Sequence, residues 1–377
     1  MKFVLFYHSL VSDWNHGNAH FLRGCASELL ARGHEVEIYE PAEGWSLRNL
    51  LSREGRAAVD EFAQRFPELH SHRYSLADFD CERALAGADV ALVHEWNDPR
   101  LVNRLGECAA GSRCRLFFHD THHRSVTDPA AIEALDLSHY AGVLAFGQSV
   151  ADRYVRAGWA RFAWVWHEAA DVRRFRPLPA SSLEGDLVWI GNWGDEERSA
   201  ELQEFLIGPV AALGLRARVY GVRYPSEAMH ALQAAGIEYG GWLPNYRVPE
   251  VFARYRCTIH VPRRAYVETL PGVPTIRMFE ALACGIPLIS APWLDSEKLF
   301  NAGSDYLVAH DGDEMRQRLR ALLDDAQLAR AIAANGLQTI RARHTCAHRV
   351  DQLLQIVARL DATASVQLSA PSPTEEA

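Results

Sequence analysis

Residues 274–290 read PTIRMFEALACGIPLIS, and they combine the signals of a helix and of a strand. Proline suits the first turn of a helix and glycine suits the position just past its end, so the run predicts a helix from Pro274 to Gly285. The apolar residues of that helix recur at helical spacing, as in a helix packed on a sheet. The apolar run from Ile286 to Ser290 predicts a buried strand, so helix and strand form one unit of a parallel α/β sheet.

The start of this helix is a candidate phosphate site. A helix N-terminus presents free backbone N–H groups and the positive end of the helix dipole, which suits a diphosphate. Arg277 and Glu280 share one face near the helix start, and a carboxylate there can accept hydrogen bonds from a ribose diol. The alternative is an ordinary helix–strand unit with a solvated Arg–Glu pair. The candidate nucleotide-sugar site comprises Gly272, Val273, Thr275, Ile276, Arg277 and Glu280.

These residues resemble the donor-site signature of GT-B glycosyltransferases of the GT4-like superfamily, nearest to the group related to the spore protein CgeB. The signature is a turn of small residues followed by R-x-F-E-A-L-A-x-G-x-P-L-I, which matches residues 277–289. The resemblance implies an α/β fold of GT-B architecture, in which two Rossmann-like, doubly wound domains face each other across a cleft and a C-terminal helix crosses back. It also implies transfer of a sugar, by default a hexose, from a nucleotide-diphosphate sugar, by default a UDP-sugar.

One position departs from the signature. Retaining members of the superfamily carry a glutamate eight residues before the one that matches Glu280, and this chain has Gly272 there. Glu268, in the preceding loop, could reach inward instead. The resemblance implies retention of the anomeric configuration, while the altered position leaves inversion open. It further implies chemistry without a metal ion and with no cofactor, the nucleotide sugar being a co-substrate.

Composition sets outer bounds on the protein class. The chain has 377 residues, which fits two domains better than one. The net charge of −9 argues against a broad electrostatic surface for nucleic acid or anionic lipid. No apolar run approaches the ~20 residues of a membrane span, and residues 1–8 read as a strand rather than a signal peptide. The seven cysteines include no CxxC pair, which disfavours a zinc site or a disulfide framework. We therefore expect a cytoplasmic protein.

The order of strand and helix signals divides the chain into two α/β halves. Residues 173–185 hold two prolines, two serines and a glycine, and they are the linker candidate. Residues 1–172 form the expected acceptor-side domain, and residues 186–345 form the expected donor domain. By resemblance, residues 346–361 form the helix that crosses back, and residues 362–377 are expected to be disordered. Expected strands lie at 3–7, 35–39, 89–94, 114–118, 142–146 and 163–166, then at 187–190, 217–220, 237–239, 257–261, 286–290 and 306–309.

A cluster of histidines follows one expected strand, at residues 119–123. Consecutive residues leaving a strand point in different directions, so one metal ion can rarely collect them, and we expect no metal site there. By resemblance, His119 matches a histidine of the first domain that reaches the donor sugar near its reactive carbon. Asp120 is expected to orient the His119 imidazole or to take part directly. The alternative is histidines that merely line a polar cleft, which is the expectation for His122.

Two more loops of the first half are expected to face the cleft, because loops at the carboxyl ends of parallel strands line it. Residues 12–18 include His16, a candidate catalytic residue, and Gly17, which lets backbone approach a ligand closely. The alternative is a loop whose polar residues only stabilise a turn. The chain lacks G-x-G-x-x-G here, which disfavours a dinucleotide-dependent dehydrogenase. Glu95 follows another strand and is a candidate base for the acceptor.

The second half offers candidate partners for the nucleotide. Gly191 and Asn192 follow an expected strand, and the amides of such a turn can meet a phosphate. Related enzymes place a basic residue directly after this glycine; since Asn192 stands here, Arg198 and Arg223 are the candidate cations. Trp242 is a candidate wall for the base. The alternatives are surface arginines and a core tryptophan.

Two other protein classes fit the same pattern. A GT-B sugar-nucleotide epimerase or phosphorylase would need no separate alcohol acceptor. A non-catalytic nucleotide-sugar-binding protein would keep the pocket without turnover. The sequence indicates neither the acceptor nor the oligomeric state.

Overall fold

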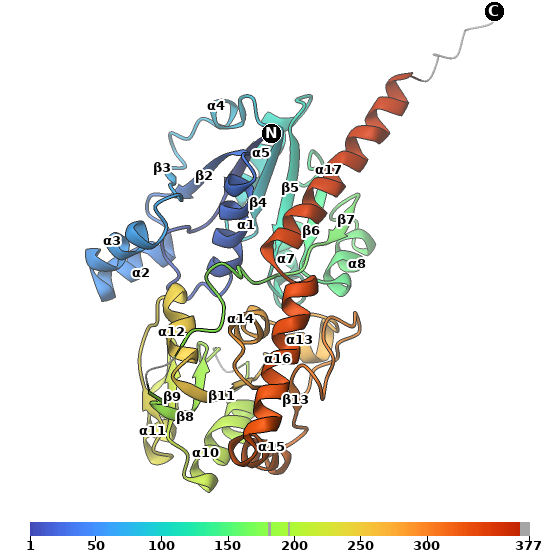
Figure 1. The fold of residues 1–377 in the computed structure, drawn as a ribbon. Coiled ribbons are helices and arrows are strands. Elements are labelled where there is room, and N and C mark those ends of the chain that lie inside the picture. The colour runs from blue at the N-terminus through green and yellow to red at the C-terminus, as the bar shows by residue number, and fades with distance from the viewer. Residues whose placement is uncertain (180–181, 195–196, 370–377) are drawn as a thin grey trace, which may run out of the picture.

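The structure is a computed structural model that describes residues 1–179, 182–194 and 197–369, the last seven of these by their backbone alone. Two α/β lobes lie one above the other in Figure 1, each built on its own sheet. All strand pairs within both sheets are parallel. Parallel strands need crossover connections, and helices supply most of them here.

The first sheet has seven strands in the order β3-β2-β1-β4-β5-β6-β7. The strands are β1 Lys2–Phe6, β2 Glu35–Pro41, β3 His72–Tyr74, β4 Val90–His94, β5 Arg115–Asp120, β6 Gly142–Ala145 and β7 Ala163–Val165. The helices are α1 Ala19–Ala31, α2 Trp45–Glu54, α3 Arg56–Arg65, α4 Cys81–Leu85, α5 Pro99–Ala109, α6 Arg124–Thr127, α7 Pro129–Glu133 and α8 Gln148–Arg156. The central strands β4 and β6 are buried along their whole length, as expected for a sheet covered on both faces.

The second sheet has six strands in the order β10-β9-β8-β11-β12-β13. The strands are β8 Gly185–Ile190, β9 Ala217–Tyr220, β10 Glu238–Tyr239, β11 Tyr255–His260, β12 Leu288–Ser290 and β13 Leu307–Val308. The α-helices are α9 Ser199–Leu202, α10 Gly208–Leu213, α11 Ser226–Ala234, α12 Val248–Phe252, α13 Arg264–Thr269, α14 Ile276–Cys284, α15 Gly312–Asp324 and α16 Ala326–Arg343. A π-helix, η1 Gln203–Ile207, and a 3₁₀-helix, η2 Asn245–Arg247, complete this half.

Helix α14 and strand β12 form the unit that residues 274–290 predict. Gly285 ends the helix at φ 64°, a left-handed conformation that glycine adopts without a steric penalty. The helix begins at Ile276 with Thr275 as its N-cap, so Pro274 stands just before the cap and not in the first turn. The tight turn at Gly272, with φ 85°, delays the helix start. Strand β12 then pairs with β11 in the second sheet.

Helix α17, Cys346–Ser369, returns from the second half and packs against α1 of the first (Figure 1). The approach is close, since a Cβ added to Gly24 would lie 2.5 Å from Cys346 Sγ. The helix continues past residue 361, where the sequence interpretation ends it. Residues 362–369 contain no proline or glycine to stop a helix, whereas residues 370–377 lie outside the described residues. Among the helices described, none is long and apolar enough to cross a membrane.

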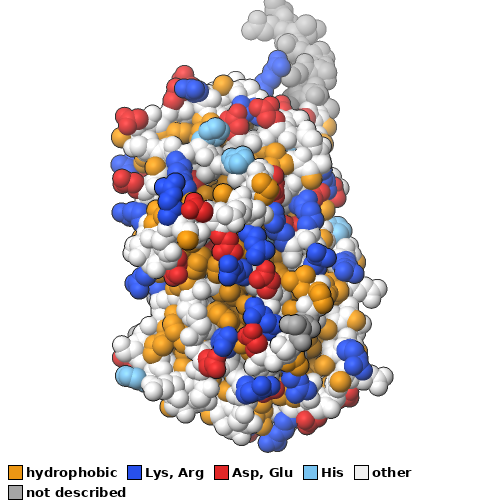
Figure 2. All heavy atoms as spheres, turned by 60° about the vertical axis from the view of Figure 1, so that its left-hand side comes forward, with side chains coloured by type: hydrophobic (Ala, Val, Ile, Leu, Met, Phe, Trp, Pro, Cys, Tyr) orange, Lys and Arg blue, Asp and Glu red, His pale blue; other side chains and the backbone are white. Residues whose placement is uncertain are grey.

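Charged side chains of both signs are intermixed on the face shown in Figure 2, with apolar side chains gathered between them. Neighbouring charges of opposite sign cancel at a distance. The coloured residues of this face therefore carry no extended field of a single sign.

A buried carboxylate in the first loop joins the two halves. Asp13 accepts a hydrogen bond from Arg23 Nη1 at 2.9 Å within its own half. From the second half it accepts Trp242 Nε1–H at 3.1 Å and the Asn245 backbone N–H at 3.0 Å. Because all three donors converge on one carboxylate, Asp13 fixes the loop of residues 12–18 against η2.

Replacing Asp13 with alanine should lower the thermal midpoint of unfolding markedly. The change leaves the buried Arg23 guanidinium without its carboxylate, and breaking a buried pair in this way costs about 3 kcal/mol or more. The matched control is Asp60→Ala, since Asp60 lies 3.9 Å from Arg56 at the surface. That exposed pair contributes less than about 1 kcal/mol. Equal shifts of the midpoint in the two variants, measured by circular dichroism, would contradict the role of Asp13.

Candidate active site

A cleft of about 970 Å³ lies between the two halves and is lined by residues of both. Strand ends and the loops that follow them form its walls, as expected where the carboxyl ends of two parallel sheets face each other. From the first half, the predicted residues His16 and Gly17 line it. From the second half, the predicted residues that line it are Gly191, Asn192, Arg198, Arg223, Thr275, Ile276 and Arg277.

The N-terminus of α14 opens into this cleft. Thr275, Ile276 and Arg277 all line it, and no side chain caps the helix start. The Thr275 hydroxyl instead contacts His260 Nε2 at 3.1 Å. Across the cleft lies Gly17, where an added Cβ would sit 3.8 Å from Ile276 Cγ2. The uncapped amides and the positive end of the helix dipole therefore face the loop of residues 12–18, as an anion site requires.

Arg198 supplies a buried cation to the same cleft. The residue is 8 % exposed, and its guanidinium donates to the carbonyl oxygens of Trp193 at 3.3 Å and Val261 at 2.8 Å, and to that of Asn192. Within the described residues, no carboxylate forms an ion pair with it. Burial, followed by the positive charges of Arg263 and Arg277, lowers the pKa of Arg198 to about 9. A buried charge without a counter-ion is costly, and an anionic ligand would offset that cost.

Two other cations of the cleft are paired with carboxylates. Arg277 pairs with Glu280 one helical turn away, and Arg263 Nη1 lies 2.7 Å from Glu197 Oε2. Arg223 also lines the cleft, and its own backbone has a φ of 61°. Arg124 also lines the cleft, and its Nη1 donates to the Glu95 carbonyl at 3.1 Å. Arg198 differs from these arginines because it is buried, and it lies in the same cleft as the start of α14.

Asn192, which stands where the sequence resemblance implies a cation, links the two halves. Its Nδ2 donates to Asn15 Oδ1 in the first half at 2.6 Å. Its Oδ1 accepts the Val222 backbone N–H at 2.8 Å. The side chain is thus occupied by protein partners, and its backbone is the part that remains for a ligand.

Glu280 does not line the cleft, although the sequence predicts that it meets a ribose diol. The carboxylate is fully buried, and it accepts hydrogen bonds from His20 Nδ1 at 3.0 Å, Asn245 Nδ2 at 2.7 Å and Arg277. Burial raises its pKa, but the Arg277 charge and these hydrogen bonds outweigh burial, so the pKa is lowered. Its place in the structure is a link between α1, η2 and α14.

Trp242 is not a wall of the cleft. Its indole N–H donates to Asp13, and its ring packs on a small apolar cluster that contains Trp14, Leu50 and Val222. The alternative interpretation, a structural tryptophan, fits these contacts. A tryptophan's indole N–H needs a partner when buried, and Asp13 supplies it.

The turn before α14 also lies outside the cleft lining. Gly272 has φ 85°, and a Cβ there would lie 2.7 Å from Ser296 Oγ and 2.8 Å from Glu297 Oε1. Val273 is buried, and a Cβ on Gly147 would lie 2.5 Å from its Cγ2. A glutamate cannot replace Gly272 without strain and clash. Glu268 is exposed on α13 and does not reach the cleft.

His119 and Asp120 lie beneath the cleft floor instead of lining it. His119 sits 4.8 Å from Trp166 and 5.8 Å from Phe21 between ring centroids, and neither ring nitrogen has a hydrogen-bond partner. Asp120 does not orient that imidazole, because its oxygens accept from the His122 backbone N–H at 2.9 Å and from Tyr154 Oη at 2.7 Å. A residue within a strand, unlike one just after it, points into the layer that covers the sheet.

Glu95 is also buried below the cleft. Its Oε1 accepts from the backbone N–H and the hydroxyl of Thr121, at 2.8 and 3.0 Å. Burial and the charge of Asp120 raise the pKa of Glu95. These contacts hold the loop after β5 in place. Glu95 therefore positions that loop, and its side chain does not reach the cleft where a sugar acceptor would bind.

The imidazoles that do line the cleft are His8, His16, His122, His123 and His260. His16 packs on His8, with ring centroids 3.9 Å apart, and its buried Nε2 has no partner. Burial, then the charges of His8 and Arg23, lowers the pKa of His16. A neutral His16 can therefore offer an unpaired ring nitrogen to a ligand. His122, which the sequence interpretation treats as structural, lies closer to the ligand space than His119 does.

Sequence reasoning misses Glu168, a buried acid that lines the cleft just after β7. The surrounding sequence, HEAAD, forms no motif, and only its place after an expected strand indicates a position near the cleft. It also misses His260 and Arg263, which leave β11. Across residues 1–179, 182–194 and 197–369, no group of three or more His, Cys, Asp or Glu side chains is arranged to hold a metal ion.

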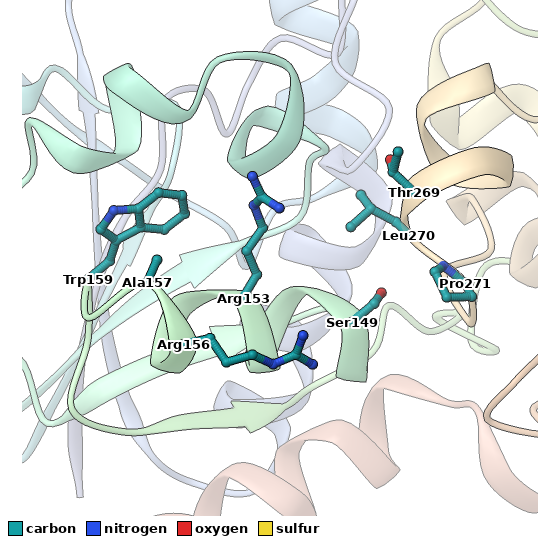
Figure 3. Close-up of a pocket in the computed structure, with 8 residues that line it drawn as sticks. All are labelled: Ser149, Arg153, Arg156, Ala157, Trp159, Thr269, Leu270 and Pro271. Atoms are coloured by element: carbon teal, nitrogen blue, oxygen red, sulfur yellow. The ribbon is translucent and has the colours of Figure 1, made fainter.

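A second pocket, of about 480 Å³, lies between α8 and the segment that follows α13. Figure 3 shows Arg153 rising from α8 with Trp159 on one side and Leu270 on the other. Arg153 Nε donates to the Ser125 carbonyl at 2.5 Å, and Arg156 pairs with Asp152 at 2.7 Å. Arg156 is thus neutralised by a carboxylate, whereas Arg153, like Arg198 in the larger cleft, is held by a backbone carbonyl.

His119→Leu should reduce the acid sensitivity of the fold. Burial lowers the pKa of His119 from its ordinary 6.5 to about 3, so below pH 6.5 the unfolded chain binds a proton that the folded protein does not. Stability is therefore lost as pH falls, by about 2 kcal/mol for this one group between pH 7 and pH 5. The variant lacks this loss, so its free energy of unfolding relative to wild type should improve by that amount. Urea unfolding of both proteins at pH 7 and pH 5 measures these free energies. If the free energy of unfolding falls equally in the variant and in wild type between the two pH values, His119 binds protons equally in the folded and unfolded states.

Comparisons with known proteins bear on the fold. Residues 198–355 match the family described as "Glycosyl transferase-like". No curated protein matches the sequence. Anabaena HepE, solved with UDP and glucose, is similar in structure, with a TM-score of 0.67 and 15 % identity over 95 % of this chain and 100 % of that one.

Two further solved structures share the arrangement. Sucrose-phosphate synthase from Thermosynechococcus elongatus has a TM-score of 0.63 and 14 % identity, over 96 % of this chain and 100 % of that one. An α-glucosyltransferase, solved with UDP and a 13-mer DNA containing an HMU base, has a TM-score of 0.67 and 12 % identity, over 95 % and 99 %. This chain therefore has the GT-B fold, and residues 198–355 are similar to the glycosyl transferase-like family.

Proposed function

We propose that this chain is a glycosyltransferase that takes a hexose from a UDP-sugar and transfers it to an acceptor. The observation that carries the proposal is the buried Arg198 guanidinium, which no described carboxylate neutralises, in the same cleft as the uncapped start of α14. A diphosphate fits both features, because it brings negative charge and oxygen acceptors.

The choice of donor is supported by likeness to proteins of known ligands. HepE was solved with UDP-glucose, and the α-glucosyltransferase was solved with UDP. The signature at residues 277–289 supports placement in the GT4-like superfamily, near the CgeB-related group, and with it retention of the anomeric configuration.

Departure of the nucleotide diphosphate is the step that this cleft assists. Negative charge grows on the diphosphate as the bond to the sugar breaks, and fixed positive groups stabilise that charge. Arg198, Arg277 and the N-terminus of α14 supply such groups, so we propose that transfer proceeds without a metal ion. His16 and His122 are the proposed contacts for hydroxyl groups near the sugar, in place of His119.

Arg198→Met should weaken UDP binding at least tenfold, with EDTA present. The variant removes a cationic donor to the diphosphate, and hydrogen bonds to charged groups contribute roughly 1.5–3 kcal/mol each. Isothermal titration calorimetry gives the Kd directly. Arg56→Met, a change of the same residue type at a site where the side chain is 87 % exposed, is the control and should bind UDP as wild type does.

Arg277→Met provides an independent test from α14, in case Arg198→Met impairs folding. UDP affinity unchanged in both variants would remove the proposed diphosphate site. Circular dichroism of each variant establishes that its fold is intact.

UDP should also raise the thermal midpoint of the wild-type protein in EDTA. A ligand that binds only the folded state at a hundredfold excess over its Kd stabilises by about 2.7 kcal/mol. GDP and dTDP in parallel test the choice of base. If none of the three shifts the midpoint in EDTA while one does so with manganese, metal-free binding is wrong.

Incubation with UDP-, GDP- and dTDP-sugars in the absence of acceptor separates the protein classes. A transferase should release the nucleoside diphosphate slowly, by transfer to water, and the anomer of the freed sugar reports retention or inversion. An epimerised sugar would identify an epimerase, and binding without any turnover would identify a non-catalytic protein.

A further inference from the structure

Four described acidic residues line the cleft, and three of them already have partners. They are Asp98, Asp128, Glu168 and Glu197. Asp98 pairs with Arg100 at 2.8 Å, Asp128 caps α7, and Glu197 lies 2.7 Å from Arg263. Glu168 differs: its side chain has no hydrogen bond within the described chain, and its Oε1 is buried.

The backbone at Glu168 is held firmly in place. Arg349, a buried residue of α17, donates from Nε to the His167 carbonyl at 2.8 Å and from Nη2 to the Glu168 carbonyl at 3.3 Å. The His167 ring contacts the Phe146 carbonyl through Nδ1 at 2.7 Å and Glu297 through Nε2 at 2.9 Å. Contacts with α17, with Phe146 and with Glu297 therefore hold the backbone of this segment, and they fix the position from which the Glu168 side chain reaches the cleft.

An unpaired buried carboxyl group is costly, and the group is only 2 % exposed. Burial and the negative charge of Glu280 raise the pKa of Glu168, while Arg277 opposes them. A ligand that satisfies this group must bring an O–H or N–H donor. A hydroxyl group both donates and accepts, so a hydroxyl of the sugar or ribose satisfies the Glu168 carboxyl group whether it is ionised or protonated. The diphosphate of a nucleotide has only acceptors at neutral pH, so it leaves an oxygen of Glu168 without a donor in either state.

Glu168 lies near Gly272, the position at which the signature of retaining enzymes has a glutamate and this chain does not. The turn at residues 272–273 packs on the segment after β6, where Gly147 approaches Val273. Phe146 of that segment lines the cleft together with Glu168, Thr275 and Ile276. A carboxyl group therefore reaches this end of the cleft from the first half, while Gly272 itself is turned toward Glu297.

We propose that Glu168 binds hydroxyl groups of the donor sugar and contributes to the choice of that sugar. The proposal rests on the proposed function, since it takes the diphosphate to lie at Arg198 and α14. With the diphosphate there, we take the sugar to extend toward the segment that holds Glu168 and the nucleoside to extend away from it.

The test compares UDP with UDP-glucose and UDP-galactose in Glu168→Ala and Glu168→Gln, by calorimetry. UDP affinity should stay within about twofold of wild type. The UDP-sugar that wild type binds best should bind roughly tenfold to hundredfold more weakly to Glu168→Ala, the range for leaving a buried hydroxyl group without its hydrogen-bond partner. Glu168→Gln, which keeps one acceptor, should fall between, and its preference between the two sugars should narrow.

Asp98→Asn is the matched control, an acid-to-amide change in the same cleft at a residue whose charge is already paired. It should leave the affinity for both UDP-sugars unchanged. Because Glu168 is an unpaired buried acid, its variants without ligand should unfold at or above the wild-type midpoint, which separates a binding defect from a folding defect.

Each other outcome overturns the inference. Equal losses for UDP and for the UDP-sugars would place Glu168 at the nucleoside, and no loss for either would remove it from the site. Failure of wild type to bind UDP at all would instead overturn the proposed function, and the inference with it.

Discussion

The Glu280 carboxylate holds the two halves of the molecule in the relation on which the cleft depends. It accepts a hydrogen bond from His20 on α1 and another from Asn245 on η2, while Arg277 binds its second oxygen. The Asp171 backbone N–H donates to His20 Nε2 at 2.7 Å, so the proton of a neutral imidazole is on Nδ1, directed at Glu280. Helix α14 is thereby fixed against α1, and Gly17 is brought opposite Ile276.

With the halves fixed in this way, positive charge collects on one wall of the cleft. Arg198 is buried against three carbonyl oxygens, and the start of α14 has no side-chain cap. Both features cost free energy in the empty protein, and an anion relieves both. Glu168 has the complementary need, because its buried Oε1 accepts no hydrogen bond from the described chain. A ligand with an anionic centre and a hydroxyl-bearing end satisfies the two together, and a nucleotide sugar is such a ligand.

The elements of the fold are readable from the sequence because their signals are local. Gly285 adopts the left-handed conformation that its position after a helix predicts, and the buried strands follow apolar runs. Strand β3, His72–Tyr74, escapes detection because it is a short, mostly exposed edge strand with no apolar run. The far end of α17 is hard to predict because residues 362–369 have the small and polar composition of a disordered tail, although they contain no residue that stops a helix.

The site residues are harder to predict because their roles depend on partners distant in sequence. The sequence resemblance implies that Glu280 and Trp242 meet the nucleotide, yet His20 and Asp13, contributed by the first half, bind their polar atoms. The sequence predicts that the strand ends at residue 118 and that His119 follows it into the cleft. Strand β5 instead runs to Asp120, so His119 lies within the strand and its side chain packs in the layer that covers the sheet. Glu168 carries no motif, and only the tertiary structure shows that its carboxyl group is unpaired.

A crystal structure of the protein with UDP, grown in EDTA, tests the central claim most directly. The diphosphate should lie within hydrogen-bond distance of the Arg198 guanidinium and of the backbone N–H groups at the start of α14, with no metal ion between the phosphates and the protein. A nucleotide bound elsewhere, for example in the pocket of Arg153 and Arg156, or one held through a metal ion, would contradict it.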